Sequence, residues 1–346
     1  MSWDQRKPEG VGNIEHTADG FTAPISIPLD PDGYFGRECP SCHALFKMRN
    51  DECKALPNDV ALTCPYCGER REHGAFLSSA QRERAMAAAR GLAQQMVHAK
   101  LNEMFSQSFG RRPSSSRGSF ISVETRYTPG SPPPIRELPD FVEDEARRII
   151  ECSSCRNHHA VFSASAFCPV CGPRPAAEKV LESIEAARQA LAVEDHLDPD
   201  RREQFRATGV FERFAVDAIE SVVSLFEAFA REQFFARASS PEDVVRGKGN
   251  VFQRLGDTAQ LFADHIGIDL SALAGHDRWD RLQRAFARRH ILVHRGGIVD
   301  QRFLDQVPDS GLAIGQRLVI RRVDADEALS DLEAVVQALD QAGGTQ

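Results

Sequence analysis

The chain has 346 residues, with 42 Lys and Arg against 50 Asp and Glu, 42 % hydrophobic and 27 % charged residues, a balance typical of a globular protein of two or three domains. This composition excludes collagen-like and wholly disordered proteins, and the lack of any stretch of about 18 uncharged apolar residues excludes a membrane-spanning helix. The net charge of −8 would repel a polyanion, so any phosphate-binding surface must be local. The first residues lack the apolar segment of a signal peptide, and we expect a cytoplasmic protein without a membrane partner.

Eight of the nine cysteines form two quartets with the same plan, a Cys-x-x-Cys turn followed by Cys-Pro-x-Cys-Gly. The quartets are Cys39, Cys42, Cys64 and Cys67, and Cys152, Cys155, Cys168 and Cys171. Two such turns place four thiolates around one ion, and both quartets resemble zinc ribbons. A filled four-thiolate shell leaves no open coordination position, so we predict two structural Zn²⁺ ions per chain. Redox dithiols or an iron site are the alternatives.

The ninth cysteine, Cys53, lies between the two turns of the first quartet and is predicted to be a spare thiol. Gly68 and Gly172 follow the last cysteine of each quartet, where they supply a permissive backbone. Three histidines could replace a cysteine ligand, but four cysteines per site make that unnecessary: His43, His158 and His159.

Composition and hydrophobic periodicity divide the chain into five segments. These are zinc ribbon 1 at 1–75, an amphipathic helix at 76–110, a flexible linker at 111–135, zinc ribbon 2 at 136–175 and a helical domain at 176–346. The predicted fold class is therefore mainly α, an all-helical C-terminal bundle preceded by two small ribbons of short β hairpins.

Within the C-terminal segment, apolar residues at helical spacing predict helices at 178–193, about 202–238 and about 325–342. A strand-like piece at 312–321 precedes the last of them. The helix at 202–238 has too broad an apolar surface for one-sided packing, so we expect a central bundle helix or part of a dimer interface.

The segment from Trp279 to Gly297 is the richest in chemically active side chains. At ~100° per residue, Arg289 and His290 fall on the arc that faces the protein, and His294 falls at its edge. The rest of that arc is apolar: Trp279, Leu282, Phe286 and Val293. Three arginines fall on the opposite face, which is predicted to be solvated and could bind phosphate: Arg281, Arg284 and Arg288.

An inward guanidinium is costly unless it is paired or meets an anionic ligand. One explanation is a buried salt bridge to Asp217, Glu220 or Glu227. The other is an anion site, in which arginine binds a phosphate while histidine moves protons. Spacing alone leaves both open. A zinc hydrolase site is disfavoured, because Ile291 stands where a glutamate would have to follow His290.

The motif Arg289-His290-x-x-x-His294, followed by Gly-Gly-Ile-Val-Asp, resembles the Arg-polar-x-x-x-His signature of HEPN domains, and the resemblance covers about 195–342. It implies an all-helical domain that commonly dimerises and a metal-independent ribonuclease in which the 2′-hydroxyl attacks the adjacent phosphorus. His294 would be the general acid or base, Arg289 would stabilise the pentacoordinate phosphate, and His290 would orient the site or bind phosphate. Glu220, with Glu227 as the other choice, would position the arginine.

Two functions of different classes follow. The first is an endoribonuclease of the HEPN type, a toxin or antiviral abortive-infection effector that acts on RNA as a homodimer. Its zinc ribbons would control it through a protein or nucleic-acid trigger, and catalysis would need no cofactor. The alternative is a non-enzymatic adaptor whose ribbons bind nucleic acid or protein while the helical domain dimerises. The intact pair Arg289 and His294 favours the enzyme.

Overall fold

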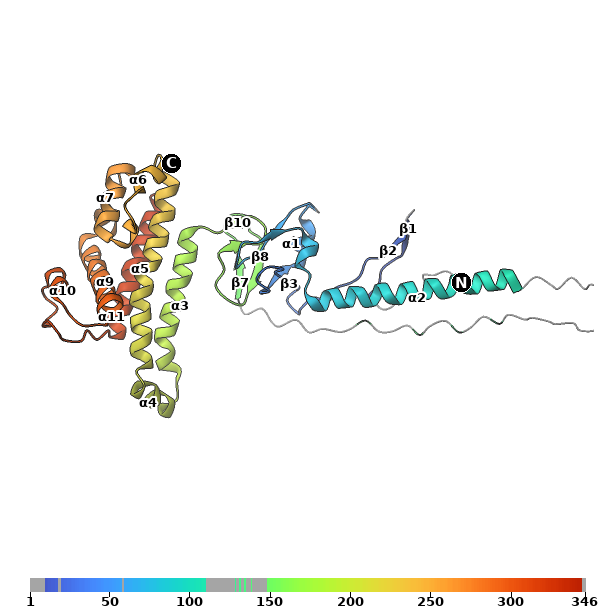
Figure 1. The fold of residues 1–346 in the computed structure, drawn as a ribbon, viewed down its shortest axis with the longest axis horizontal. Coiled ribbons are helices and arrows are strands. Elements are labelled where there is room, and N and C mark those ends of the chain that lie inside the picture. Colours follow the sequence, from blue (N-terminus) through green and yellow to red (C-terminus); the bar gives the residue numbers. More distant parts are fainter. Residues whose placement is uncertain are drawn as a thin grey trace, which may run out of the picture. The chain divides into compact units, whose positions relative to one another are not determined.

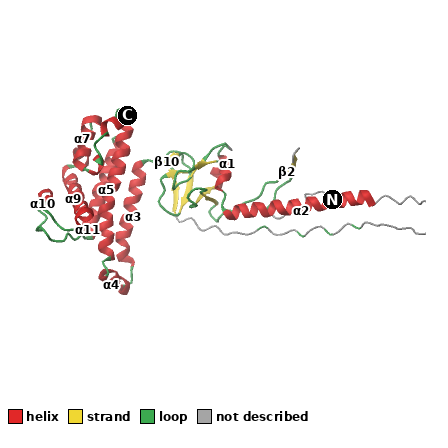
Figure 2. Ribbon diagram, in the orientation of Figure 1, coloured by secondary structure: helices red, strands yellow, loops and turns green. Residues whose placement is uncertain are grey.

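The computed structural model describes residues 10–17, 20–57, 59–109 and 148–343, and the single residues 128, 131, 134 and 138. The chain divides into two compact units, Met1–Pro173 and Arg174–Gln346 (Figure 1). Figure 2 shows that helices dominate and that strands are confined to the first unit, which confirms a mainly α chain. The linker predicted at 111–135 lies almost entirely outside the described residues.

One four-stranded antiparallel sheet joins the two cysteine quartets. Its spatial order is β3 (Tyr34–Glu38), β4 (Leu45–Arg49), β8 (His158–Val161) and β7 (Arg148–Glu151). The β3–β4 hairpin carries the first turn of quartet one, and the β7–β8 hairpin carries the first turn of quartet two. The sequence pattern predicts two separate ribbons, because it carries no signal for the pairing of β4 with β8.

The pairing of β4 with β8 relates the two ribbons by an approximate two-fold axis. Lys47 pairs with Ala160 at the centre of the register, and these two residues follow Cys42 and Cys155 by the same interval of five. The hydrogen bonds between the second turns are also reciprocal: Thr63 N to Pro169 O at 2.8 Å, and Phe167 N to Pro65 O at 3.1 Å. The two copies of the sequence repeat therefore fold as a pair of ribbons that are related by pseudo-two-fold symmetry within one chain.

Short elements complete the first unit. They are β1 (Glu15–Thr17), β2 (Gly20–Thr22), α1 (Asn50–Ala55), β5 (Leu62–Thr63), β6 (Arg70–Arg71), the 3₁₀ turn His73–Phe76, β9 (Phe167–Cys168) and β10 (Gly172–Pro173).

A long helix, α2 (Ser79–Phe109), occupies the segment predicted as amphipathic. Ala88 and Leu92 are buried in a small cluster with Val11 and Leu138. Other large apolar side chains of this helix are exposed: Met86, Val97, Leu101 and Met104.

The second unit is a helical bundle. Its elements are α3 (Ala176–His196), α4 (Pro199–Ala207), α5 (Val210–Arg237), α6 (Pro241–Val245), the 3₁₀ turn η3 (Val251–Gln253), α7 (Leu255–Ile266), α8 (Leu270–Ala274), α9 (His276–Arg295), α10 (Gln301–Gln306) and α11 (Arg322–Gln341). Helix α5 packs against α3, α9 and α11 and is the central helix that its broad apolar surface predicts. Phe226 of α5 lies edge-on to Trp279 and Phe286 of α9, with ring centroids 6.4 and 5.5 Å away.

Two predicted elements of this unit are wrong. The helix predicted at 202–238 is broken into α4 and α5, because Gly209 adopts a left-handed conformation with φ of 75°. The strand predicted at 312–321 is a loop with one isolated bridge, between Ile298 and Arg317. Neither unit contains, within its described residues, a helix long and apolar enough to cross a membrane.

Ion pairs to α11 fix the rotation of α9. Arg281 donates two hydrogen bonds, of 2.9 and 2.6 Å, to Asp331, which is 2 % exposed. Arg288 pairs with Asp324 at 3.3 Å. Two of the three arginines predicted to be solvated, Arg281 and Arg288, therefore pack against α11, whereas Arg284 pairs with Asp309 in the loop after α10 at 2.7 Å.

Candidate metal centres and active site

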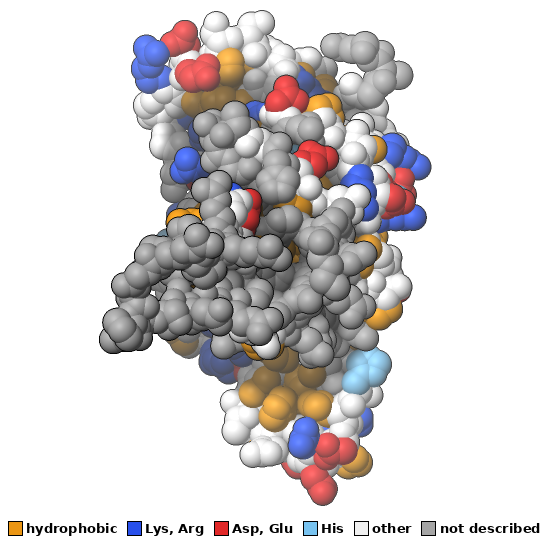
Figure 3. Space-filling model, turned by 90° about the vertical axis from the view of Figure 1, so that its right-hand side faces the viewer, with side chains coloured by type: hydrophobic (Ala, Val, Ile, Leu, Met, Phe, Trp, Pro, Cys, Tyr) orange, Lys and Arg blue, Asp and Glu red, His pale blue; other side chains and the backbone are white. Residues whose placement is uncertain are grey.

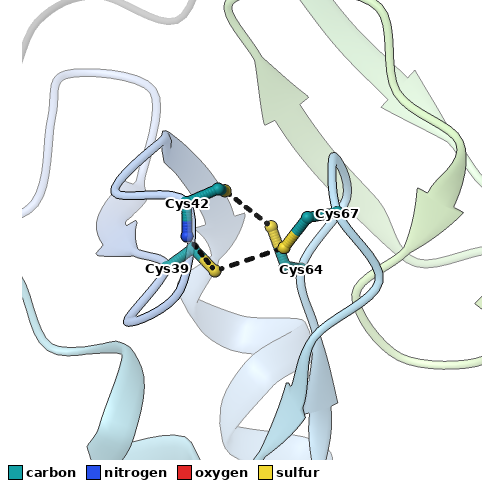
Figure 4. Close-up of side chains that lie close together, drawn as sticks. All are labelled: Cys39, Cys42, Cys64 and Cys67. Atoms are coloured by element: carbon teal, nitrogen blue, oxygen red, sulfur yellow. Dashed lines mark hydrogen bonds between the residues drawn. The ribbon is translucent and has the colours of Figure 1, made fainter.

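The first cysteine quartet is preassembled (Figure 4). The Sγ atoms of Cys39 and Cys67 are 3.6 Å apart, and those of Cys42 and Cys64 are 3.7 Å apart. A tetrahedron with Zn–S bonds of ~2.3 Å has an S···S edge of about 3.8 Å, whereas a disulfide needs ~2.05 Å. Backbone N–H groups of Ser41 and Cys42 point at Cys39 Sγ. The quartet could therefore bind one zinc ion.

The second quartet has the same geometry. Sγ of Cys152 lies 3.4 Å from that of Cys171, and Sγ of Cys155 lies 3.6 Å from that of Cys168. Burial, together with negative charge on Cys152 and Cys155, raises the pKa of the Cys168 thiol to about 12. Four thiolates this close repel one another unless a cation binds between them, so the donor set and the spacing both fit a second zinc ion.

The extra cysteine and the nearby histidines stand outside both quartets. Cys53 lies on α1, is 9 % exposed, and has its Sγ 4.0 Å from His73 Nδ1. His43 is exposed beside Glu38, and His158 pairs with Glu52 at 2.7 Å. His159 is buried in β8 and likewise belongs to neither quartet.

The glycines that end the two quartets allow a matched test. Gly68 and Gly172 have φ of 76° and 90°, but only at Gly68 would a Cβ meet another group, 2.8 Å from the Phe167 ring. We expect Gly172→Ala to cost about 1 kcal/mol, from backbone strain alone, and Gly68→Ala at least ~1 kcal/mol more. Thermal melting of the zinc-loaded variants, and the rate at which a chelator removes their zinc, would measure both effects. Equal losses in the two variants would contradict the close contact.

A cavity of about 630 Å³ in the helical unit is lined by three of the predicted site residues and not by the fourth, Glu220. Arg289, His290 and His294 of α9 line one wall of it. The other walls come from α5, η3, the first turn of α7, and α10, which packs beside α9 (Figure 1). The remaining lining residues are Val223, Asn250, Gln253, Arg254, Leu255, Gly256, Gln283, Phe286, Ala287, Arg302, Asp305 and Gln306.

Arg289 is partly buried and carries no ion pair with any described carboxylate. Its Nε is buried and has no hydrogen-bond partner. The acidic residues considered for a salt bridge are engaged elsewhere or lie outside the cavity lining: Asp217 pairs with Arg213, Glu227 accepts a hydrogen bond from Gln253, and Glu220 does not line the cavity. The buried salt bridge is therefore not present, and the guanidinium is available to an anionic ligand.

The two histidines lie one turn apart at the mouth of the cavity. Their ring centroids are 4.9 Å apart, and His294 is exposed. Burial lowers the pKa of His290, and the nearby cation Arg302 lowers it further. Val293, placed inward by the helical wheel, is instead 44 % exposed, because it lies in the last turn of α9, which ends at Arg295.

The structure adds residues that the sequence pattern did not single out. Gln253 lines the cavity and donates from Nε2 to Glu227 at 2.7 Å, so Glu227 contacts the cavity wall whereas Glu220 does not. Arg254 and Arg302 bring the arginines of the lining to three, against one acidic residue, Asp305. No periodicity signals these residues, since they come from a 3₁₀ turn, a helix start and a six-residue helix.

The cationic lining contrasts with the surface elsewhere. On the face shown in Figure 3, the visible Lys and Arg side chains are interspersed with Asp and Glu, and hydrophobic side chains gather at its lower end. The chain as a whole carries a net charge of −8. The arginines of the lining would attract an anion locally, whereas the net charge of the whole chain would repel a polyanion.

The lowered pKa of His290 predicts an acid-sensitive helical unit. As the pH falls below the ordinary histidine pKa of about 6.5, the unfolded chain binds a proton that folded His290 resists, so stability decreases. Replacement of His290 by Asn should reduce this loss between pH 7.5 and 5.5, as measured by urea unfolding monitored at Trp279. Zinc loss at low pH affects both proteins alike, and an equal pH dependence would contradict the prediction.

Comparison of the chain with protein-family models, with curated proteins and with solved structures finds no match. The function proposed below therefore rests on the geometry of the two quartets and of the cavity.

Proposed function

We propose that this protein is a metal-independent endoribonuclease of the HEPN type, whose active site is the cavity at Arg289, His290 and His294. The observation that carries the proposal is the unpaired, partly buried guanidinium of Arg289 beside two histidines in a cationic cavity. A guanidinium in that environment is suited to a phosphodiester, and imidazoles titrate in the range needed for proton transfer.

In the proposed reaction, one histidine removes the proton of the ribose 2′-hydroxyl as its oxygen attacks the adjacent phosphorus. The bond from phosphorus to the 5′-oxygen breaks, and that oxygen takes a proton from the second acid–base group. Arg289 stabilises the negative charge of the pentacoordinate phosphate. The products carry a 2′,3′-cyclic phosphate and a 5′-hydroxyl. His294, the more exposed imidazole, is the primary proton-transfer group, and His290 supports it.

We further propose that the quartets bind structural zinc and that the ribbon unit controls the nuclease, as in a toxin or antiviral effector. Uncontrolled RNA cleavage would harm the cell that makes the protein, which supports a regulated enzyme. The adaptor alternative requires no unpaired arginine in a cavity, and it gains no observation of its own from the structure.

The proposal is tested with wild-type protein and the His294→Ala variant, incubated with total cellular RNA in EDTA and, as a control for the ribbons, with zinc. Cyclic-phosphate ends that appear in both buffers, and only with wild type, are the expected result. When the two proteins are expressed in cells, wild type should inhibit growth and the His294→Ala variant should not. Intact RNA in every arm, with no effect on growth, would overturn the enzyme and favour the adaptor.

A homodimer is part of the proposal, because large apolar side chains are exposed around the end of α9. They are Val293, Ile298, Ile314 and Val319, with exposed fractions of 43 to 61 %. Clustered exposed apolar side chains are typical of an interface. We expect the double variant Ile298→Asp, Val319→Asp to be a monomer by light scattering where wild type is a dimer. An unchanged mass would place the interface elsewhere.

A further inference from the structure

One cation of the cavity, Arg302, has no role in the reaction proposed above. It lies on α10, its side chain is exposed, and it lines the cavity with Arg289. No described carboxylate forms an ion pair with it. Asp305, the acidic residue of the lining, accepts a hydrogen bond from Gln301 at 2.8 Å. Arg302 is therefore a second guanidinium available to a ligand in the same cavity.

The short helix that carries Arg302 is well anchored. Asp300 caps it by accepting a hydrogen bond from Phe303 N at 3.0 Å, and Phe303 itself is only 2 % exposed. Asp300 also pairs with Arg295 at the end of α9, at 3.2 Å. The position of Arg302 is thus set relative to α9, and its charge acts on the His290 imidazole.

A single phosphodiester carries one negative charge, whereas the cavity offers two unpaired guanidinium groups. The volume of about 630 Å³ also exceeds what one phosphate group needs. We propose that Arg302 forms a second phosphate subsite, which binds the phosphodiester next to the one held by Arg289. The pocket would then select strands with at least two consecutive phosphates over a dinucleotide with one. That the ligand is an RNA strand rests on the proposed function.

Binding of uncleavable 2′-O-methyl oligonucleotides tests the subsite without requiring catalysis. The probes are a dinucleotide with one phosphate, a trinucleotide with two, and the same trinucleotide with its second linkage replaced by a neutral methylphosphonate. Wild type should bind the charged trinucleotide roughly tenfold more tightly than the other two. The Arg302→Gln variant should bind all three alike, and its salt dependence should fall by about 0.7 in log–log slope.

The matched control is Arg201→Gln, which removes one exposed positive charge on α4, outside the cavity. It should keep the wild-type preference. An Arg302→Gln protein that retains the preference, or that loses affinity for all three probes equally, would overturn the second subsite. If wild type shows the preference but cleaves no RNA, the subsite stands and the proposed nuclease fails. If wild type cleaves RNA but shows no preference, the subsite alone fails.

Discussion

Replacement of Arg289 by alanine should reduce RNA cleavage by at least about 100-fold, while the helical unit remains as stable as wild type to within ~1 kcal/mol. The catalytic loss follows from removing the group that meets the charged phosphorus. Stability is retained because no described carboxylate depends on Arg289, whose Nε is buried without a partner. His294→Ala should lose cleavage by about 10²- to 10⁴-fold, also without unfolding. Cleavage rates and urea unfolding measure both effects.

The matched control for Arg289 is Arg284, on the same helix but outside the cavity, where it pairs with Asp309 at 2.7 Å. Arg284→Ala should leave cleavage unchanged. The competing explanation for an inward arginine, a buried salt bridge, makes the opposite prediction: its loss would cost ~3–5 kcal/mol because an unpaired acid would remain. An Arg289→Ala protein that is markedly destabilised but still cleaves RNA would restore that explanation.

The features that depend on local geometry could be predicted from the spacing of residues in the sequence. A Cys-x-x-Cys turn closes on one ion by itself, so the two quartets could be found from the sequence, and the structure brings each together within 4.8 Å. The convergence of Arg289, His290 and His294 also follows from one helix, since residues one turn apart share a face. These parts of the sites can be predicted from the sequence, because local geometry alone brings their residues together.

What the sequence could not predict depends on distant partners. The β4–β8 pairing that joins the ribbons links segments more than 100 residues apart, and no short-range pattern records it. The sequence places Arg281 on a solvated face, because Asp331, which neutralises it, lies 50 residues away on α11. The spacing likewise does not distinguish Glu220 from Glu227 on the same helix, whereas in the structure Gln253 of the cavity wall donates a hydrogen bond to Glu227.

Replacement of Cys64 by serine should remove one of two zinc ions and unfold the ribbon unit around the first quartet. Cys64 is fully buried, and its Sγ lies 3.7 Å from that of Cys42. Zinc binding supplies about 10–16 kcal/mol of folding free energy in small structural zinc sites. The apolar core around the first quartet is small, so it cannot keep the ribbon folded once that free energy is lost. Metal analysis and thermal melting would report the loss, and the helical unit should retain its own transition.

The matched control is Cys53→Ser, a buried cysteine of the same module outside the quartet, which should keep both zinc ions. The effect of Cys64→Ser should also reach the second quartet, because β4 pairs with β8 and the Phe167 ring packs against Gly68. The remaining zinc should therefore be lost to a chelator faster than from wild type. A second site that holds its zinc as firmly as before would show that the ribbons fold independently, and an unchanged metal content would remove Cys64 from the ligands.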